Sequence, residues 1–225
     1  MLARAVALTA KDLRLALSGG QGVVQTVLFG LLLIFVFSLS RAPGELTPAQ
    51  AASAIFWLAS AFGAILIFNT LYGFEEETGA RTALCMAPMP ASTVWLGKAL
   101  AGLLLLLLCQ AVFAPAAVAF LGQRPAGDAA AALGYVLAVD TGLAALGSLM
   151  GSLAGGRTAR ESLLTVILFP LLVPLLLAGI RLLEAAIDPG AGADVAAWLG
   201  LAMAFDALFS GAALILFPFL YVGDE

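Results

Sequence analysis

The sequence predicts an all-α integral membrane protein, with six transmembrane helices preceded by an N-terminal amphipathic helix. Hydrophobic residues make up 63% of the chain and charged residues 11%, whereas soluble domains average roughly 45–50% and about 25%. The mean hydropathy is +1.09. Long apolar runs, joined by short polar loops, fill most of the 225 residues. A helix needs about 20 apolar residues to cross a bilayer, and it satisfies its own backbone groups there.

Residues 1–20 predict an amphipathic helix that lies flat on the membrane surface. At about 100° per residue its cations and its large apolar side chains fall on opposite sides, which sets Arg4, Lys11 and Arg14 against Leu2, Val6, Leu13 and Leu17. Such cations meet anionic lipid headgroups. The alternative is a charged lead-in without fixed structure. Gly19 and Gly20 supply the bend into the first span.

Residues 21–225 are expected to form one transmembrane domain. Its predicted spans are approximately Gln21 to Leu39, Ala52 to Phe74, Val94 to Leu121, Ala131 to Ala154, Ser162 to Ile180 and Ala197 to Tyr221. Lys and Arg are more frequent in the segments on the side of the N-terminus, which predicts that both termini lie in the cytoplasm. The net charge of −4 argues against a nucleic-acid-binding role. Between the last two spans, Arg181 to Trp198 predicts a short outer helix and a turn.

The longest predicted cytoplasmic loop, residues 75–93, contains the charged residues that are most informative about function. Glu75, Glu76 and Glu77 stand at the C-terminal end of a helix, where carboxylates oppose the helix dipole. Arg81, four residues after Glu77, is one candidate to compensate them. A basic groove on another protein is a second candidate. The alternative is a solvated acidic helix end, followed by a plain turn.

The rest of this loop predicts a short helix along the membrane face. Gly79 ends the preceding helix, residues 80–87 form the short one, and Pro88 and Pro90 stop it. Ser92 or Thr93 is then expected to cap the next span.

Two features inside the spans predict close helix packing and buried polar contacts. Gly147, Gly151 and Gly155 form two overlapping G-x-x-x-G steps, which favour packing within one bundle over a subunit contact. Asp140 and Asp206 lie at similar depth within two spans. Intramembrane acids are rare and usually functional, so one possibility is that the two carboxylates approach one another or a common polar cavity. The other is that each hydrogen-bonds a neighbouring helix and only fixes packing.

The composition argues against catalysis by this chain alone. The sequence has no histidine, the usual haem and zinc ligand. It also lacks the G-x-x-x-x-G-K-[ST] loop that nucleotide binding needs. Cys85 and Cys109 are expected to stay reduced, because one falls in a cytoplasmic loop and the other in lipid. We therefore expect neither a metal nor a cofactor bound by this chain itself.

Taken together, these motifs resemble a known family of transport proteins. The basic surface helix, six spans, and a loop of the form E-x-G-x-x-x-x-L-x-x-x-P-x-P before Gly97-Lys98-Ala99-Leu100 resemble permeases of ABC-2-type exporters. Within that group, Lys11-Asp12-Leu13-Arg14, the Glu75 to Pro90 loop and the run from Leu168 to Pro174 look like the haem exporter B (CcmB) family of cytochrome c maturation. The similarity covers nearly the whole chain.

This resemblance implies a multi-pass subunit of the bacterial inner membrane, present in two copies, with haem as a substrate that is transported or handled. It also implies a separate cytoplasmic ATPase that hydrolyses ATP, a haem-handling membrane subunit with a small helper, and a periplasmic haem chaperone. The residues expected to contact the ATPase are Glu75, Glu76, Glu77, Gly79, Arg81, Leu84, Pro88 and Pro90. Two alternatives remain at this stage: an ABC-2-type permease for a drug, lipid or polysaccharide, and a membrane scaffold without a transport role.

Overall fold

The structure, a computed structural model, describes the chain except for Arg41 and residues 43–45, 124–126, 155–157, 189, 191, 193 and 223–225. Side chains are not described for residues 21, 153–154, 158–169 and 222. The described residues form eight helices and no strand: α1 (Leu2–Gly19), α2 (Gln21–Leu39), α3 (Ala49–Thr78), α4 (Ala80–Met86), α5 (Ala91–Leu121), α6 (Ala129–Ala154), α7 (Thr158–Ile187) and α8 (Val195–Val222). The predicted all-α class is confirmed.

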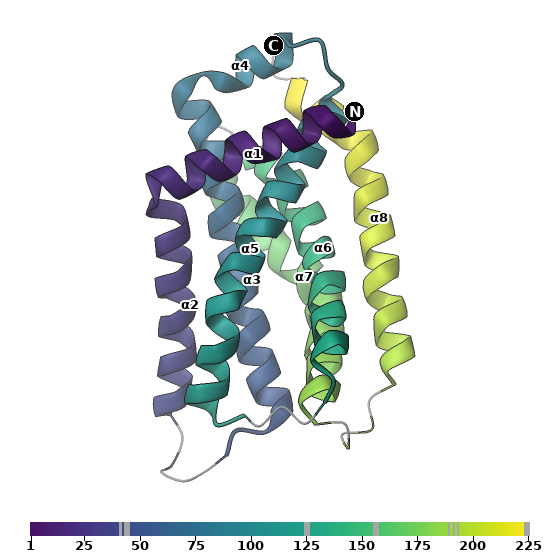
Figure 1. Ribbon diagram of the computed structural model, residues 1–225. Coiled ribbons are helices and arrows are strands. Elements are labelled where there is room, and N and C mark those ends of the chain that lie inside the picture. Colours follow the sequence, from purple (N-terminus) through teal and green to yellow (C-terminus); the bar gives the residue numbers. More distant parts are fainter. Residues whose placement is uncertain are drawn as a thin grey trace.

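Six of these helices are long and apolar enough to cross a membrane: α2, α3, α5, α6, α7 and α8. They run side by side as an elongated bundle, with α1 lying across one end of it (Figure 1). α3 packs against α2, α5, α6 and α7, and 61% of its span is buried, against 17% in α2 and in α8. α3 is therefore the central helix, whereas α2 and α8 face lipid over most of their surface.

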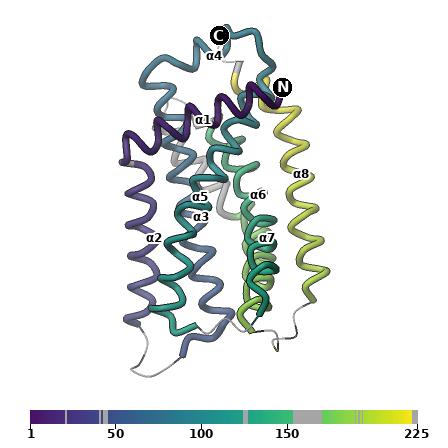
Figure 2. Tube along the Cα trace, in the orientation of Figure 1, coloured from purple at the N-terminus to yellow at the C-terminus, as the bar shows by residue number. Residues whose placement is uncertain are grey.

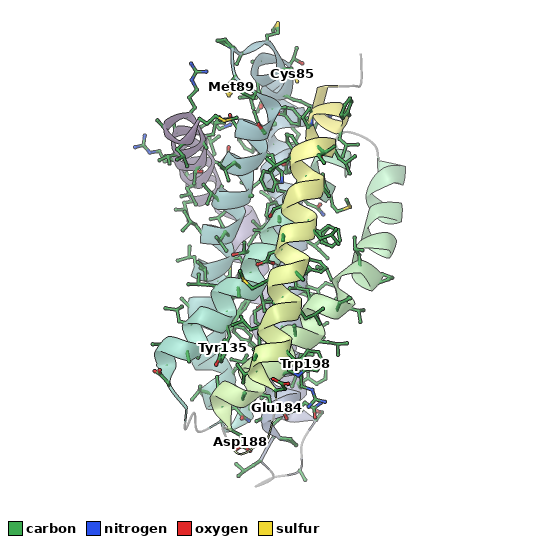
Figure 3. The ribbon with its side chains drawn as sticks, turned by 90° about the vertical axis from the view of Figure 1, so that its right-hand side faces the viewer. Cys85, Met89, Tyr135, Glu184, Asp188 and Trp198 are labelled. Atoms are coloured by element: carbon green, nitrogen blue, oxygen red, sulfur yellow. The ribbon has the colours of Figure 1, made fainter. Side chains whose placement is uncertain are left out.

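We call the end of the bundle that holds α1, α4 and both chain termini the α1 end (Figure 2). Cys85 and Met89 lie there, while Glu184, Asp188 and Trp198 lie at the opposite end (Figure 3). Alternate spans must return to the same side of a bilayer, so this gathering of the termini fits an even number of crossings. The protein is a multi-pass membrane protein.

α1 turns sharply into α2 at Gly20, which has a φ of 67°. A positive φ is accessible to glycine without steric cost, so the predicted Gly-rich bend is confirmed. Three residues of α1 are buried against the bundle, Ala5, Thr9 and Asp12, while Leu2, Val6 and Leu17 are exposed. α1 therefore has one protein-facing sector and a separate, exposed apolar sector.

Two local predictions are wrong. Residues 181–187 do not form a separate outer helix, because α7 continues unbroken to Ile187. Leu182 and Ala186 are buried there, and Arg181 pairs with Glu184 at 3.0 Å one turn on, so the segment is stabilised as helix. Neither Ser92 nor Thr93 caps α5, since the helix already begins at Ala91 with Pro90 in the N-cap position.

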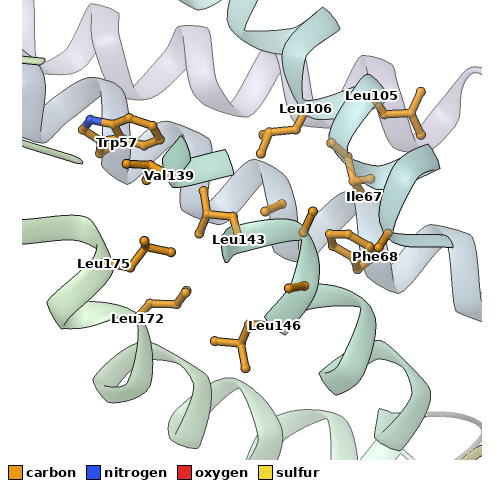
Figure 4. Close-up of a cluster of buried hydrophobic side chains, with 14 of the residues drawn as sticks. Trp57, Ile67, Phe68, Leu105, Leu106, Val139, Leu143, Leu146, Leu172 and Leu175 are labelled. Carbon is orange, nitrogen blue, oxygen red and sulfur yellow. The ribbon is translucent and has the colours of Figure 1, made fainter. Parts of the chain in front are cut away.

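The core is close-packed around the ring of Phe68 (Figure 4). A Cβ atom added to Gly102 of α5 or to Gly147 of α6 would collide with this ring, which is 2% exposed. Gly151 faces Tyr72 of α3 in the same way. The structure thus places Gly147 and Gly151 in packing within the bundle, and Gly155 lies outside the described residues.

We predict that Gly147→Ala destabilises the protein by about 1–3 kcal/mol, because the Phe68 ring is held between two helices and cannot move aside. Gly134→Ala on the same helix is the matched control. A Cβ there meets nothing within 4 Å, so we expect no loss of stability. Thermal unfolding of the purified protein in detergent measures both, and equal melting temperatures for the two variants would contradict this packing.

Candidate functional site

The α1 end contains a group of charged side chains buried between four helices. We call it the charged cluster, and it consists of Lys11 and Asp12 of α1, Glu75 of α3, Lys98 of α5, and the hydroxyl group of Tyr221 of α8. Asp12, Glu75 and Lys98 are each at most 4% exposed. Buried charges are tolerated only when they are paired and hydrogen-bonded.

Lys98 is the centre of the charged cluster. Its Nζ atom lies 2.8 Å from Glu75 Oε1 and 3.4 Å from Asp12 Oδ2, and it donates a 2.7 Å hydrogen bond to the Leu71 carbonyl oxygen. The ammonium also stands over the Tyr72 ring, 5.0 Å from its centroid. These contacts join α5 to α1 and to α3.

Glu75 extends the charged cluster to α8 and to the membrane surface. Its Oε2 atom accepts a 3.1 Å hydrogen bond from the Tyr221 hydroxyl, and its Oε1 atom lies 3.2 Å from Lys11 Nζ. Burial lowers the pKa of Lys11, but hydrogen bonding and Coulomb attraction to Asp12 and to Glu75 outweigh it and raise that pKa above its ordinary value. Lys11 therefore stays charged at neutral pH.

α4 is tied to the last turn of α8 through Arg81. The guanidinium donates to the carbonyl oxygens of Tyr221, at 3.1 Å, and Leu220, at 3.3 Å, and it lies over the Tyr221 ring. Arg81 also pairs with Glu76 at 2.6 Å. The sequence suggested Glu77 as its partner. The structure instead pairs Arg81 with Glu76, because Gly79 (φ 67°) turns the chain between α3 and α4.

The outer surface of α4 and its flanking loop is exposed. Met86 is 77% exposed, and Glu77, Gly79, Pro88 and Pro90 are exposed too. Leu84 faces inward and packs against the core. The backbone after α4 is held down by Arg4, which donates a 2.6 Å hydrogen bond to the Pro88 carbonyl oxygen. Residues 77–90 therefore present a fixed, partly apolar surface at the α1 end, which we call the α4 ridge.

Of the residues expected to contact a partner, the structure keeps Glu75 inside the bundle and leaves Glu77 at the surface. Sequence reasoning missed the roles of Asp12, Lys98 and Tyr221. Lys98 carried a usable signal, since a lysine several residues inside an apolar span needs a counter-charge, and the acidic helix end of α3 reaches the same depth.

Asp140 belongs to a polar contact in the middle of the bundle. Its Oδ1 atom accepts a 2.8 Å hydrogen bond from Gln110 Nε2, which also donates to Ser60 Oγ at 3.1 Å. Asp140 is fully buried. The contact joins α3, α5 and α6, as expected for a polar group that fixes helix packing.

Asp206 lies on the other side of α6. It packs against Gly142, where an added Cβ would come within 2.5 Å of Asp206 Oδ1. Gly142 is two residues after Asp140, which is a rotation of roughly 200° on a helix. The described residues show no hydrogen bond between the two carboxylates, and each instead packs with a different neighbour.

A cavity of about 500 Å³ lies between α3, α5, α6 and α7, toward the end opposite α1. Its walls are apolar apart from Gln110 and Gln123. Neither Asp140 nor Asp206 lines this cavity. The described residues contain no group of His, Cys, Asp and Glu side chains arranged to hold a metal ion.

Comparison with known proteins identifies the family. Residues 3–222 match the family described as CcmB protein. The chain belongs to the CcmB family. This assignment agrees with the resemblance seen in the loop motifs, and the match covers all eight helices.

Three relatives from bacteria are named "Heme exporter protein B". The chain is 31% identical to the protein of Rhodobacter capsulatus, over 79% of this chain and 81% of the relative. It is 28% identical to that of Bradyrhizobium diazoefficiens, over 80% and 81%. It is 29% identical to that of Paracoccus denitrificans, over 95% and 94%. The CcmB relatives thus match the chain over most of both lengths.

We predict that Lys98→Met destabilises the protein by about 3–5 kcal/mol, because it leaves Glu75 and Asp12 buried beside too little positive charge. Lys11→Met is the control within the same charged cluster. The Lys11 side chain is 38% exposed, so water can replace part of its contact with Asp12 and Glu75, and its loss should cost less than the loss of Lys98. Denaturant unfolding in mixed micelles compares the two variants, and an equal cost for both would refute the central position of Lys98.

Proposed function

We propose that this chain is the permease subunit of an ABC transporter that exports or delivers haem for c-type cytochrome biogenesis. The names of its relatives and its family support this proposal. The chain would lie in the bacterial inner membrane with the α1 end in the cytoplasm. The excess of Lys and Arg in the segments at this end favours that orientation. A haem-handling membrane subunit, a small helper and a periplasmic haem chaperone would complete the system.

The observation that carries the mechanism is the connection between the α4 ridge and the charged cluster. An ATPase that drives a permease must bind a surface that is exposed and rigidly connected to the transmembrane helices. The α4 ridge meets both conditions, because Met86 and Pro88 are exposed while Arg81 is bonded to α8. We infer that two copies of the chain each dock one ATPase subunit on this ridge.

The same contacts indicate which spans would move. Arg81 binds the Tyr221 carbonyl, and the Tyr221 hydroxyl binds Glu75, which in turn binds Lys98. A displacement of α4 is therefore passed to α8, α3 and α5 together, and through Asp12 to α1. Closure of the ATPases on ATP would then move this end of the bundle as one body, an instance of rigid-body switching. ATP hydrolysis itself takes place in the partner.

We predict that Met86→Asp weakens binding of the ATPase partner at least about tenfold. Met86 is exposed in the chain alone, and an aspartate there would lose its water when the ATPase covers it. Leu46→Asp is the matched control, since Leu46 is 68% exposed at the opposite end of the bundle. Co-purification in mild detergent reports both. If Met86→Asp retains the partner as the wild type does, the ATPase does not dock on α4.

The haem assignment is tested by complementation. In a bacterium that lacks its own heme exporter protein B, we expect this chain, expressed with its ATPase partner, to restore c-type cytochromes, measured by haem staining of membrane fractions. Cytochromes that stay absent, although the chain inserts and binds its ATPase, would contradict the haem assignment and favour an exporter of another substrate.

A further inference from the structure

A second cavity, of about 200 Å³, opens beside the charged cluster where α1, α2 and α3 meet. We call it the α1–α3 cavity. Its charged lining comes from Lys11, Asp12 and Glu75, two threonines of α3 also line it, and its apolar lining includes Ala16 and Phe74. A water molecule takes about 30 Å³ of liquid, so the cavity holds a polar group several times that size.

The most buried charged groups that line the α1–α3 cavity, Asp12 and Glu75, are hydrogen-bond acceptors. Asp12 is 4% exposed, and its Oδ2 atom accepts no hydrogen bond from the residues that the structure describes. The Lys98 ammonium lies 3.4 Å from this oxygen and is already bonded to Glu75 and to the Leu71 carbonyl oxygen. A buried carboxylate oxygen without a donor is costly, so this position favours a ligand that brings a cationic N–H group.

The rim of the α1–α3 cavity has the opposite charge. Lys11 is half-buried, and two of its three ammonium donors face Asp12 Oδ1 and Glu75 Oε1. The third donor is available to an anion at the mouth. The cavity therefore runs from a positive rim to a negative interior, which matches a zwitterion that enters with its cation first.

The surroundings of the mouth are apolar and belong to the membrane surface. Leu15 and Phe74 line the cavity and are 38% and 42% exposed. Leu17, 54% exposed, continues this surface along α1. Such a surface suits acyl chains.

We propose that the α1–α3 cavity binds the headgroup of phosphatidylethanolamine, with the ammonium at Asp12 and Glu75 and the phosphate at Lys11. In this lipid the ammonium is the outermost group and the phosphate lies between it and the chains, in the order that the cavity requires. Phosphatidylglycerol lacks the cation, and the trimethylammonium of phosphatidylcholine has no N–H to donate. The bound lipid would then lie between α1 and the first two spans, α2 and α3.

Native mass spectrometry of the full-length protein with equimolar phosphatidylethanolamine, phosphatidylcholine and phosphatidylglycerol tests this directly. We expect phosphatidylethanolamine to be retained about tenfold over either competitor, as one charge-assisted hydrogen bond implies. Ala16→Leu fills the cavity and leaves its charges in place, so it should abolish the preference. Ala10→Leu, at an exposed position of the same helix, should keep it.

Equal or stronger retention of either competing lipid would overturn the proposal, and so would a preference that survives Ala16→Leu. If soluble glycerophosphoethanolamine displaces the lipid at equal concentration, the occupant is a free headgroup and not a lipid. A second measurement needs no variant. Carbodiimide treatment of the wild type in phosphatidylethanolamine nanodiscs should form an amide between the lipid amine and Asp12 or Glu75. Peptide mapping that finds lipid on neither carboxylate would also overturn the proposal.

Discussion

The ammonium of Lys98, enclosed between the carboxylates of Asp12 and Glu75, is the interaction on which the α1 end of this bundle depends. Desolvating three charged groups is expensive, and the pairing is stable only in one geometry, because each partner must be in place for the others to be tolerated. The result is that helices distant in sequence, α1, α3, α5 and α8, have a fixed mutual arrangement at the point where α4 joins them. The rest of the bundle is held mainly by apolar packing, with the contact between Gln110 and Asp140 in its middle.

Under the proposed function, this contrast would give the two ends of the molecule different roles. The α1 end has an exposed ridge with a dense set of polar bonds beneath it, so a force applied there is shared among several spans. The other end contains an apolar cavity of about 500 Å³ whose walls are rich in alanine. Haem ligation by histidine would fall to partner proteins, since the chain has none.

Much of the fold could be predicted from the sequence, because a bilayer leaves few options for long apolar runs. The six spans, the bend at Gly20 and the short helix after Gly79 all follow from hydropathy and backbone preference. The charged cluster could not be predicted in the same way. Its pairs join residues up to 146 positions apart, as between Glu75 and Tyr221, and only the packing of the helices determines which charges meet. Glu75 and Glu77 look equivalent in the sequence, yet one is buried and the other is exposed. The continuation of α7 past Ile180 was missed because the hydrophobic pattern weakens there while the helix remains stabilised by its own side-chain pair.

If the charged cluster transmits motion from the ATPase to the spans, the double variant Lys98→Met/Glu75→Gln should uncouple ATP hydrolysis from cytochrome maturation. This variant removes one charge of each sign, so the protein should still fold, and the α4 ridge that would bind the ATPase is unchanged. The measurement is the ratio of c-type cytochrome matured to ATP hydrolysed by the assembled transporter. We expect ATP hydrolysis to persist while this ratio falls at least about tenfold, equivalent to the loss of about 1.4 kcal/mol of coupling. A ratio equal to that of the wild type would contradict it.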